Sequence, residues 1–441
     1  VSIASRWLEA LGNPGTFVAR AADLPEDDTG NRQLAYAIER MTYADPIAAR
    51  TAWTELTGKR SFDADLRAAT DRHIALWTAR DNLPGAHDLL AALPKDAQDE
   101  EVLRWRARSS LRMQRFDDLL ADIELMPAEE RDSEEWRYWR GIALIRAGNA
   151  DEGRTLLTEL AGERSYHGFL AADELQTEYA LRDTAIPADE AVLKELSKNL
   201  ALIRARELFY VGLDSKGRSE WDAAVRPMPR EQRLQAARLA SRWGWHSRAI
   251  ATAAGAGEFD DLSIRYPLPY RDAFQDHSGA ANIGPAWAYG VARSESLFMR
   301  DVRSSAGAIG LMQLMPSTGR LVARKIQLPY SGIATLTDPQ GNIRLGTSYL
   351  GQMAERFADN HVLATAAYNA GPGRVDEWLP EGTPVDTRIW IETIPFNETR
   401  QYVRRVLAAE TIFHWRMTGE IRRLRESLPP VVTPAEQVSQ N

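Results

Sequence analysis

The sequence contains no cysteine among its 441 residues. Disulfide bonds, thiol nucleophiles and thiolate metal ligands are therefore excluded. The absence suits a chain that is exported without oxidative folding, although it does not by itself identify a compartment. The 7 histidines form no His-Glu-x-x-His pair, so the sequence also predicts no zinc site.

Other absences narrow the function further. The formal net charge of −8 argues against a general nucleic-acid binder, because phosphate contact needs a basic surface. No apolar run approaches the roughly 20 residues that span a bilayer. The sequence has neither the Gly-x-Ser-x-Gly elbow of a serine hydrolase nor the spacing of a phosphate-binding loop. The chain begins with Val and shows no signal peptide, so we expect a processed product or a fragment.

Helical patterns account for most of what is present, and no stretch predicts a long sheet. The length and the 44% apolar content predict two or three packed domains. In residues 1–185, Trp, Leu and Ala recur at helical spacing, and Trp105 and Trp139 lie 34 positions apart. A period near this length is typical of stacked helix pairs, which predicts an α-superhelical solenoid. An irregular helical bundle is the alternative.

The rest of the sequence divides into three parts. Residues 186–262 continue as helix and predict a helical linker domain. Glycine, proline and capped short helices become frequent in residues 263–427, which predict a separate domain. Residues 428–441 are rich in proline and then polar, and they predict a disordered tail.

Glu295 is the most unusual residue of the 263–427 segment. Read as a helix, this stretch places apolar residues on one stripe at i, i+3 and i+4 spacing, and Glu295 falls on that stripe. A carboxyl group pressed against apolar surface has a raised pKa, which suits a general acid near neutral pH. The competing interpretation is a structural salt bridge with Arg293 or Arg303.

Three later stretches add candidate side chains: a turn of small residues, the end of a helix before a Gly-Pro-Gly break, and a segment before the last long helix. The candidates on them are Ser304, Gln313, Met315, Tyr368, Asn369 and Glu392. Each stretch also has a plainer interpretation, namely a packed loop, a capped helix end, or a carboxylate with fixed structural partners.

Taken together and in this order, these stretches resemble the soluble lytic transglycosylases of bacterial peptidoglycan, whose catalytic domain is similar to goose-type lysozyme. The match is carried by Ala292-Arg-Ser-Glu-Ser296, Gly310-Leu-Met-Gln-Leu-Met-Pro316, Asn342-Ile-Arg-Leu-Gly, and residues 367–374 and 392–403. Glu207-Leu-Phe-Tyr and Ser219-Glu-Trp221 resemble the family's linker. The sequence departs from the family at Met299-Arg300, where Asn or Asp followed by Pro is usual, and at Thr318-Gly319.

The resemblance implies an all-α enzyme with a lysozyme-like catalytic domain over 263–427. It implies cleavage of the β-1,4 bond between N-acetylmuramic acid and N-acetylglucosamine, with formation of 1,6-anhydromuramic acid ends. Glu295 would be the single catalytic acid and base. The residues that it implies in substrate contact, or in ordering the site, are Ser304, Gln313, Met315, Tyr368, Asn369, Glu392 and Tyr402.

The same resemblance implies a monomeric periplasmic protein that acts on peptidoglycan glycan strands and meets other cell-wall enzymes. It implies no metal, no organic cofactor, no nucleic acid and no membrane span. Two alternatives remain open at this stage. One is a lysozyme-like or chitinase-like muramidase that uses water, and the other is a cell-wall scaffold with a vestigial catalytic domain.

Overall fold

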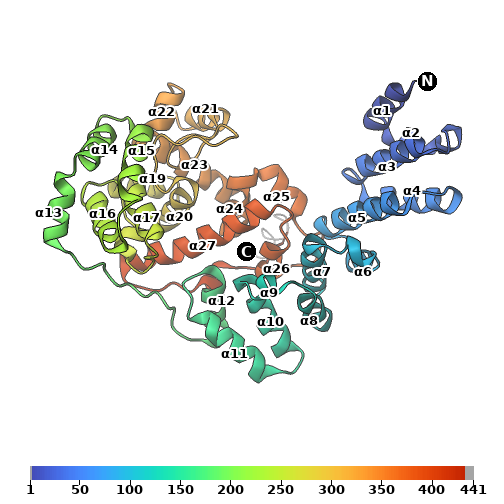
Figure 1. Cartoon of the computed structure of the whole chain (residues 1–441), viewed down its shortest axis with the longest axis horizontal. Coiled ribbons are helices and arrows are strands. Elements are labelled where there is room, and N and C mark those ends of the chain that lie inside the picture. The colour runs from blue at the N-terminus through green and yellow to red at the C-terminus, as the bar shows by residue number, and fades with distance from the viewer. Residues whose placement is uncertain (1, 433–441) are drawn as a thin grey trace. The chain divides into compact units, whose positions relative to one another are not determined.

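The structure is a computed structural model that describes residues 2–432 (Figure 1). Within that range helices dominate, and β-structure is limited to isolated bridges at Arg303–Ile309, Ile309–Leu314 and Val385–Val431. The predicted mainly all-α fold is confirmed. No helix in this range combines the length and the apolar character that crossing a membrane requires. The chain divides into two compact units.

The first unit comprises residues 2–160 and the distant segment Arg388–Asn397. Its helices are α1 (Ile3–Gly12), α2 (Pro14–Ala19), α3 (Asp28–Thr42), α4 (Pro46–Lys59), α5 (Ala64–Arg80), α6 (Ala86–Ala91), α7 (Glu100–Arg112), α8 (Phe116–Glu124), α9 (Ala128–Arg131), α10 (Glu134–Arg146), most of α11 (Ala150–Ala161) and most of α26 (Thr387–Glu392). Successive helices pack in pairs, such as α3 with α4 and α7 with α8. Trp105 and Trp139, which suggested the repeat, are both buried. Paired helices therefore form this unit, as the repeat predicted.

The segment Arg388–Asn397 belongs to the first unit although it lies late in the sequence. Figure 1 shows α26, in the orange-red of the C-terminal half, beside the teal α7. Arg108 of α7 donates its Nε–H to the backbone carbonyl oxygen of Glu392 at 3.1 Å. The N-terminal part of the first unit ends at residue 160, whereas the predicted solenoid ends at residue 185. The predicted domain bounds remain a prediction.

The second unit comprises Ala161–Thr387 and residues 398–432. Its helices are α12 (Tyr166–Leu175), α13 (Glu190–Lys198), α14 (Leu200–Tyr210), α15 (Asp214–Val225), α16 (Arg230–Arg242), α17 (His246–Gly255), α18 (Leu262–Arg265), α19 (Arg271–Ala280), α20 (Pro285–Ser296), α21 (Pro316–Lys325), α22 (Ile333–Thr337), α23 (Pro339–Arg356), α24 (His361–Ala370), α25 (Pro372–Trp378) and α27 (Asn397–Thr418). Helices α13–α17 enclose a core around Trp221 and Trp245, whose ring centroids lie 5.7 Å apart. In helices α19–α27, the largest buried side chains include Trp287, Tyr289 and Phe413.

The predicted tail of residues 428–441 needs a correction over residues 428–432. Val431 is fully buried and exchanges backbone hydrogen bonds with Val385 at 2.8 and 3.0 Å. The Thr387 hydroxyl donates to the Pro429 carbonyl oxygen. This stretch is packed because its valines bury apolar surface, which its proline content obscured in the sequence. Residues 433–441 lie outside the described residues.

Candidate active site

Glu295 lies in the last turn of α20, where that helix passes close to α27. Gly290 of α20 makes the close approach possible, because a Cβ atom there would lie 3.0 Å from the Val406 carbonyl oxygen of α27. The helix ends at Ser296, and the next residue, Leu297, adopts a left-handed conformation with φ of 50°. The crossing brings the Glu295 carboxyl group next to Tyr402 of α27.

Burial dominates the electrostatics of Glu295. It raises the pKa of this carboxyl group from 4.5 to about 7. The Tyr402 hydroxyl approaches the carboxyl group and lowers its pKa, although the pair does not reach the geometry of a full hydrogen bond. Among more distant charges, Arg405 lowers the pKa and Glu398 raises it. A carboxyl group with this pKa is protonated in a large fraction of molecules near neutral pH, as a general acid must be.

The salt-bridge interpretation of Glu295 is not supported. Arg293 donates its Nε–H to the Arg265 carbonyl oxygen at 2.9 Å, and its guanidinium lies 4.0 Å from the centre of the Tyr266 ring. Arg303 is exposed. Within residues 2–432, no cation forms an ion pair with the Glu295 carboxylate. The charge of this side chain is therefore not neutralised by a direct partner.

The backbone turns sharply after Glu295. Leu297 and Phe298 both have positive φ angles, 50° and 65°, which are unfavourable for large side chains. The Phe298 ring packs edge-on against Tyr289 and Phe413, with centroid distances of 6.1 and 6.3 Å. Buried aromatic packing thus stabilises a strained turn directly after the candidate acid.

Two crossed ion pairs hold the residues that follow this turn. Arg300 donates to both Asp214 carboxylate oxygens, at 2.8 and 2.9 Å. Arg218 donates to both Asp301 oxygens, at 2.6 and 3.0 Å. Asp214 and Arg218 lie one turn apart on α15, and bidentate arginine–carboxylate contacts are among the stronger ion pairs. Arg300, where the sequence departs from the family, thus helps to anchor the turn after Glu295 to α15.

The turn of small residues keeps a compact shape through its own contacts. Ser304 closes it, because its Oγ accepts the Ala308 N–H at 3.0 Å. Gly310 has φ of 85°, and a Cβ atom there would lie 2.1 Å from the Leu336 carbonyl oxygen. Only glycine fits this position. Ser304 therefore has a structural role in the turn, in addition to the substrate contact predicted for it.

Gln313 and Met315 lie at the end of the same turn. The Gln313 Nε2 donates to the carbonyl oxygens of Val302 and Gly310, at 3.1 and 2.8 Å. Its side-chain oxygen accepts no hydrogen bond from the described residues. The Met315 side chain is 39% exposed, which is unusual for a large apolar residue. Both therefore offer a free group to a ligand, as the predicted sugar contacts require.

Tyr368 and Asn369 end α24, and Tyr368 ties that helix to the turn. The Tyr368 hydroxyl donates to the Met312 carbonyl oxygen at 2.7 Å. Burial raises the pKa of Tyr368, and the nearby Glu295 carboxylate raises it further. The Asn369 Oδ1 accepts the Thr399 hydroxyl at 2.7 Å. Burial and then the charge of Glu295 therefore raise the pKa of both Tyr368 and Tyr402.

Glu392 is the one predicted site residue that the structure assigns to the first unit. Its carboxylate accepts the Arg108 Nε–H at 3.1 Å and the Trp139 Nε1–H at 3.1 Å, and the residue is 1% exposed. Arg108 also pairs with Glu135. Its contacts are thus those of a buried structural carboxylate, and its predicted role in substrate contact remains a prediction.

Two residues that hold the site together were not predicted. The buried Ser296 donates its hydroxyl to the Leu311 carbonyl oxygen at 2.7 Å and links the end of α20 to the turn. The buried Asn342 accepts the Met312 N–H at 2.8 Å and donates to the Leu336 carbonyl oxygen at 2.8 Å. Both lie in the stretches that carry the resemblance, but neither has a chemical group that suggests catalysis.

Three family descriptions match separate parts of the chain. The transglycosylase SLT domain matches residues 272–391, which fall inside the predicted catalytic segment. The soluble lytic murein transglycosylase L domain matches residues 195–262, inside the predicted linker. The soluble lytic transglycosylase helical domain matches residues 393–421, which include all of α27.

Known relatives match over most of the chain. It is 31% identical over 422 residues to the soluble lytic murein transglycosylase of Escherichia coli K12, covering 94% of this chain and 65% of that protein. An inactive mutant of the lytic transglycosylase Slt from Pseudomonas aeruginosa has a TM-score of 0.84 at 33% identity, covering 96% of this chain and 69% of that one. The 70 kDa soluble lytic transglycosylase of Escherichia coli has a TM-score of 0.77 at 30% identity, covering 92% and 66%. The chain belongs to the soluble lytic transglycosylase family.

Proposed function

We propose that this chain is a peptidoglycan lytic transglycosylase with Glu295 as its only catalytic carboxyl group. It cleaves the β-1,4 bond between N-acetylmuramic acid and N-acetylglucosamine and leaves a 1,6-anhydromuramic acid end. The observation that carries the proposal is a buried carboxyl group with a pKa of about 7 that forms no ion pair with a cation of residues 2–432. Such a group can give a proton and take one back near neutral pH.

The reaction begins with Glu295 protonated. It donates its proton to the glycosidic oxygen as the bond from that oxygen to the muramic C1 breaks, and the N-acetylglucosamine leaves with a hydroxyl group. The carbonyl oxygen of the muramic 2-acetamido group bonds to C1 and stabilises the positive charge there. The substrate thus supplies the group that a second carboxylate supplies in most glycosidases.

In the second step Glu295 is ionised and acts as a base. The C6 hydroxyl of the muramic unit attacks C1 and displaces the acetamido oxygen, and Glu295 takes the hydroxyl proton. One bond from oxygen to C1 is broken, one is formed, and no water is consumed. The pKa of Glu295 must therefore suit both proton transfers, which a value near 7 does.

The scarcity of other acids around Glu295 favours this single-carboxyl mechanism. Among residues 2–432, the one acid that affects its pKa is Glu398, an exposed residue of α27 whose effect is smaller than those of burial, Tyr402 and Arg405. Gln313, Met315, Tyr368 and Asn369 are proposed to bind the sugars through their amide, thioether and phenol groups. Ser304 and Tyr402 are proposed to orient the substrate and the acid.

The names of the relatives point in the same direction. The relatives are called soluble lytic murein transglycosylases, and a mutant of the Pseudomonas aeruginosa protein with glutamine in place of glutamate is described as inactive. This fits a reaction that depends on one glutamate. We further propose that the protein acts as a monomer in the periplasm, where it meets glycan strands and other cell-wall enzymes.

Digestion of purified cell-wall sacculi tests the proposal. Wild-type protein should release muropeptides with anhydromuramic ends, which mass spectrometry distinguishes by the loss of one water relative to reducing ends. Reducing ends would identify a hydrolytic muramidase instead. No release by protein that is folded and binds sacculi would favour a scaffold with a vestigial site.

A further inference from the structure

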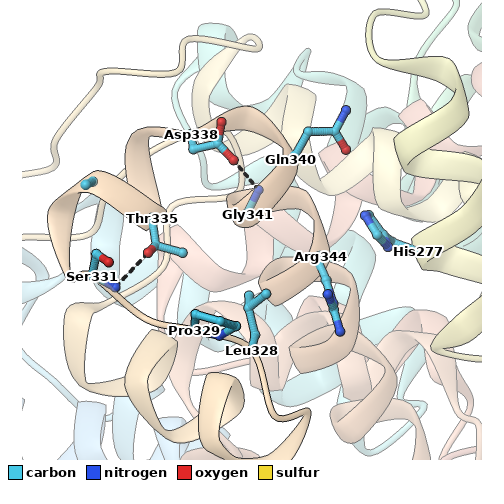
Figure 2. Close-up of a pocket in the computed structure, with 10 residues that line it drawn as sticks. His277, Leu328, Pro329, Ser331, Thr335, Asp338, Gln340, Gly341 and Arg344 are labelled. Atoms are coloured by element: carbon cyan, nitrogen blue, oxygen red, sulfur yellow. Dashed lines mark hydrogen bonds between the residues drawn. The ribbon is translucent and has the colours of Figure 1, made fainter.

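A pocket lies in the second unit, between the end of α19, the chain before α22 and the start of α23 (Figure 2). Its volume is about 430 Å³, and none of the predicted site residues lines it. This size is sufficient for a small organic molecule. The proposed reaction does not use this pocket.

One side of the pocket is cationic. Arg344 of α23 is half-buried and forms no ion pair with the described residues. His277 of α19 also lines this side, and its pKa is lowered by burial and then by the neighbouring positive charge of Arg344. A half-buried arginine without an acidic partner is able to take a carboxylate through two parallel hydrogen bonds.

The opposite side of the pocket carries hydroxyl groups, and an apolar side chain lies next to them. Figure 2 shows Ser331 and Thr335 across from His277 and Arg344. Thr335 accepts the Ser331 N–H at 2.9 Å, which leaves both hydroxyl groups able to donate. Leu328 contributes apolar surface between the two sides. The pocket thus combines a site for an anion with contacts for small apolar groups and amides.

The corner between α22 and α23 fixes the shape of the pocket. Asp338 caps α23, because its Oδ2 accepts the Gly341 N–H at 2.7 Å. A Cβ atom on Gly341 would lie 2.8 Å from the Thr335 carbonyl oxygen, so the two helices meet too closely for a side chain there. The charge of Asp338 also disfavours a ligand with several negative charges, such as a phosphate.

We propose that this pocket binds the C-terminal carboxylate of a short peptide with small apolar side chains. Arg344 takes the carboxylate, with His277 beside it, and the hydroxyl groups of Ser331 and Thr335 face the peptide backbone. The proposal rests on the proposed function, because the peptide stems of peptidoglycan supply such ends. Its role is to recognise peptides on the glycan strand away from Glu295.

Helix α23 connects this pocket to the candidate active site. Arg344 and Gly341 border the pocket, while Asn342 between them holds the backbone of Met312 in the turn next to Tyr368. A peptide that rests on the pocket therefore contacts the same helix that supports the turn. The protein should accordingly bind glycan strands with intact peptide stems more tightly than strands without them.

The first experiment measures binding of N-acetyl-D-alanyl-D-alanine by calorimetry, with the same dipeptide amidated at its C-terminus as the comparison. Wild-type protein should bind the free acid at least ~10-fold more tightly than the amide, because the charged contact to Arg344 is lost in the amide. Arg344→Gln should weaken binding of the acid by a similar factor, and His277→Gln should weaken it less. Arg324→Gln, an exposed residue of α21 outside the pocket, is the matched control and should bind as wild type does.

Equal binding of acid and amide would overturn the proposal, and so would unchanged binding in Arg344→Gln. Displacement of the dipeptide by millimolar inorganic phosphate would also contradict it, because a simple anion site would then suffice. Circular dichroism checks that each variant is folded, and the His277 variant provides a second test from another helix. Glu295→Gln should bind the dipeptide normally. Dipeptide binding without any cell-wall cleavage would contradict the proposed function alone, whereas cleavage without dipeptide binding would contradict only the pocket.

Discussion

Glu295 and Glu392 are both glutamates near helix ends, but their surroundings differ in one decisive respect. Glu295 forms no ion pair with any cation in the described part of the chain, and burial raises its pKa to about 7. Glu392 lies in the first unit, where Arg108 and Trp139 each donate to its carboxylate at 3.1 Å. Because a nearby cation favours the ionised form, the surroundings of Glu392 suit a fixed negative charge, whereas those of Glu295 suit a proton that can move.

The comparison teaches that burial of a carboxyl group does not identify a catalytic acid by itself. Both residues precede or occupy apolar stretches in the sequence. Glu295 was a site candidate because of that setting, whereas a site role for Glu392 was implied by the family resemblance. What separates them is the presence or absence of a counter-ion contributed by a distant part of the chain. Variants at the two positions should therefore fail in different ways.

The largest effect is expected at Glu295. Glu295→Gln keeps the shape of the side chain but cannot donate the proton, so turnover of glycan strands should fall by at least ~10³-fold. Binding of strands and the folded structure should be retained. Turnover of purified sacculi and co-sedimentation with them measure the two properties. Glu355→Gln, an exposed residue of α23, is the control, and activity within ten-fold of wild type in Glu295→Gln would refute the assignment.

At Glu392 we expect a loss of stability instead. Glu392→Ala removes the buried carboxylate that accepts from Trp139 and that shares Arg108 with Glu135, which should lower the free energy of unfolding by roughly 3 kcal/mol. Denaturant unfolding of the full chain measures this value. Turnover per folded molecule should stay close to that of wild type.

The control is an exposed ion pair of the same unit. Asp28 pairs with Arg32 at 2.9 Å with both side chains largely exposed, so Asp28→Ala should cost under ~1 kcal/mol. If Glu392→Ala kept the wild-type free energy of unfolding but lost turnover, Glu392 would contact the substrate as the resemblance implied. The contrast drawn between a structural Glu392 and a catalytic Glu295 would then be wrong.

An intermediate effect is expected from the crossed ion pairs after Glu295. Arg218→Asp places two negative charges together and should lower turnover several-fold, with a loss of roughly 1–2 kcal/mol in stability. Adding Asp301→Arg restores opposite charges and should recover part of both. Turnover and unfolding of the single and double variants test this coupling.

A matched exposed pair joins α14 to the same helix. Arg204 donates to Glu220 at 3.1 Å, and both side chains are more than a third exposed. Reversal of that pair should change turnover little. Equal effects at the two pairs would mean that the residues after the Glu295 turn are not positioned by α15.

The smallest effect is a shift in pH dependence. Because Glu295 must be protonated to act as an acid, kcat/KM should fall as the pH rises through about 7. Glu398→Gln removes a negative charge that raises the pKa of Glu295, so the fall should move to lower pH. Arg405→Gln removes a positive charge that lowers it, so the fall should move to higher pH.

Both residues are exposed, so the two shifts should be small and should shrink further in high salt. The double variant should return close to the wild-type profile. Shifts in the same direction for both single variants would show that another group controls the profile.

The sequence predicted those features that depend on local pattern. Helical spacing predicted the paired helices around Trp105 and Trp139 and the acid on the apolar stripe of α20. The glycines predicted the turn, because few other residues fit where the backbone approaches closely. The position of Gln313 and Met315 on that turn followed in the same way.

Contacts between distant residues were not predictable from pattern. Nothing local reveals that Arg108 reaches Glu392, which is 284 positions away, or that Asp214 holds Arg300. The predicted disorder of residues 428–432 was wrong for a related reason, because Val431 pairs with Val385, which is 46 positions away. Ser296 and Asn342 were passed over because their side chains bond to the backbone of residues that lie 15 and 30 positions away, Leu311 and Met312, and no local pattern reveals such contacts.

The elevated pKa of Glu295 also makes the free energy of unfolding depend on pH. An unfolded chain releases this proton near pH 4.5, whereas the folded chain keeps it until about pH 7, so folding at pH 6 takes up a proton from solution. This contribution to stability is complete below pH 4.5 and is lost as the pH rises through 7, by roughly 3 kcal/mol in total. Glu295→Gln has no proton to lose, so it should exceed the wild type in stability at pH 8 by up to that amount. Denaturant unfolding of both proteins at pH 5 and pH 8 measures the difference, and a variant no more stable than wild type at pH 8 would contradict it. The proton that Glu295 is proposed to donate to the substrate is thus also one that stabilises the folded chain.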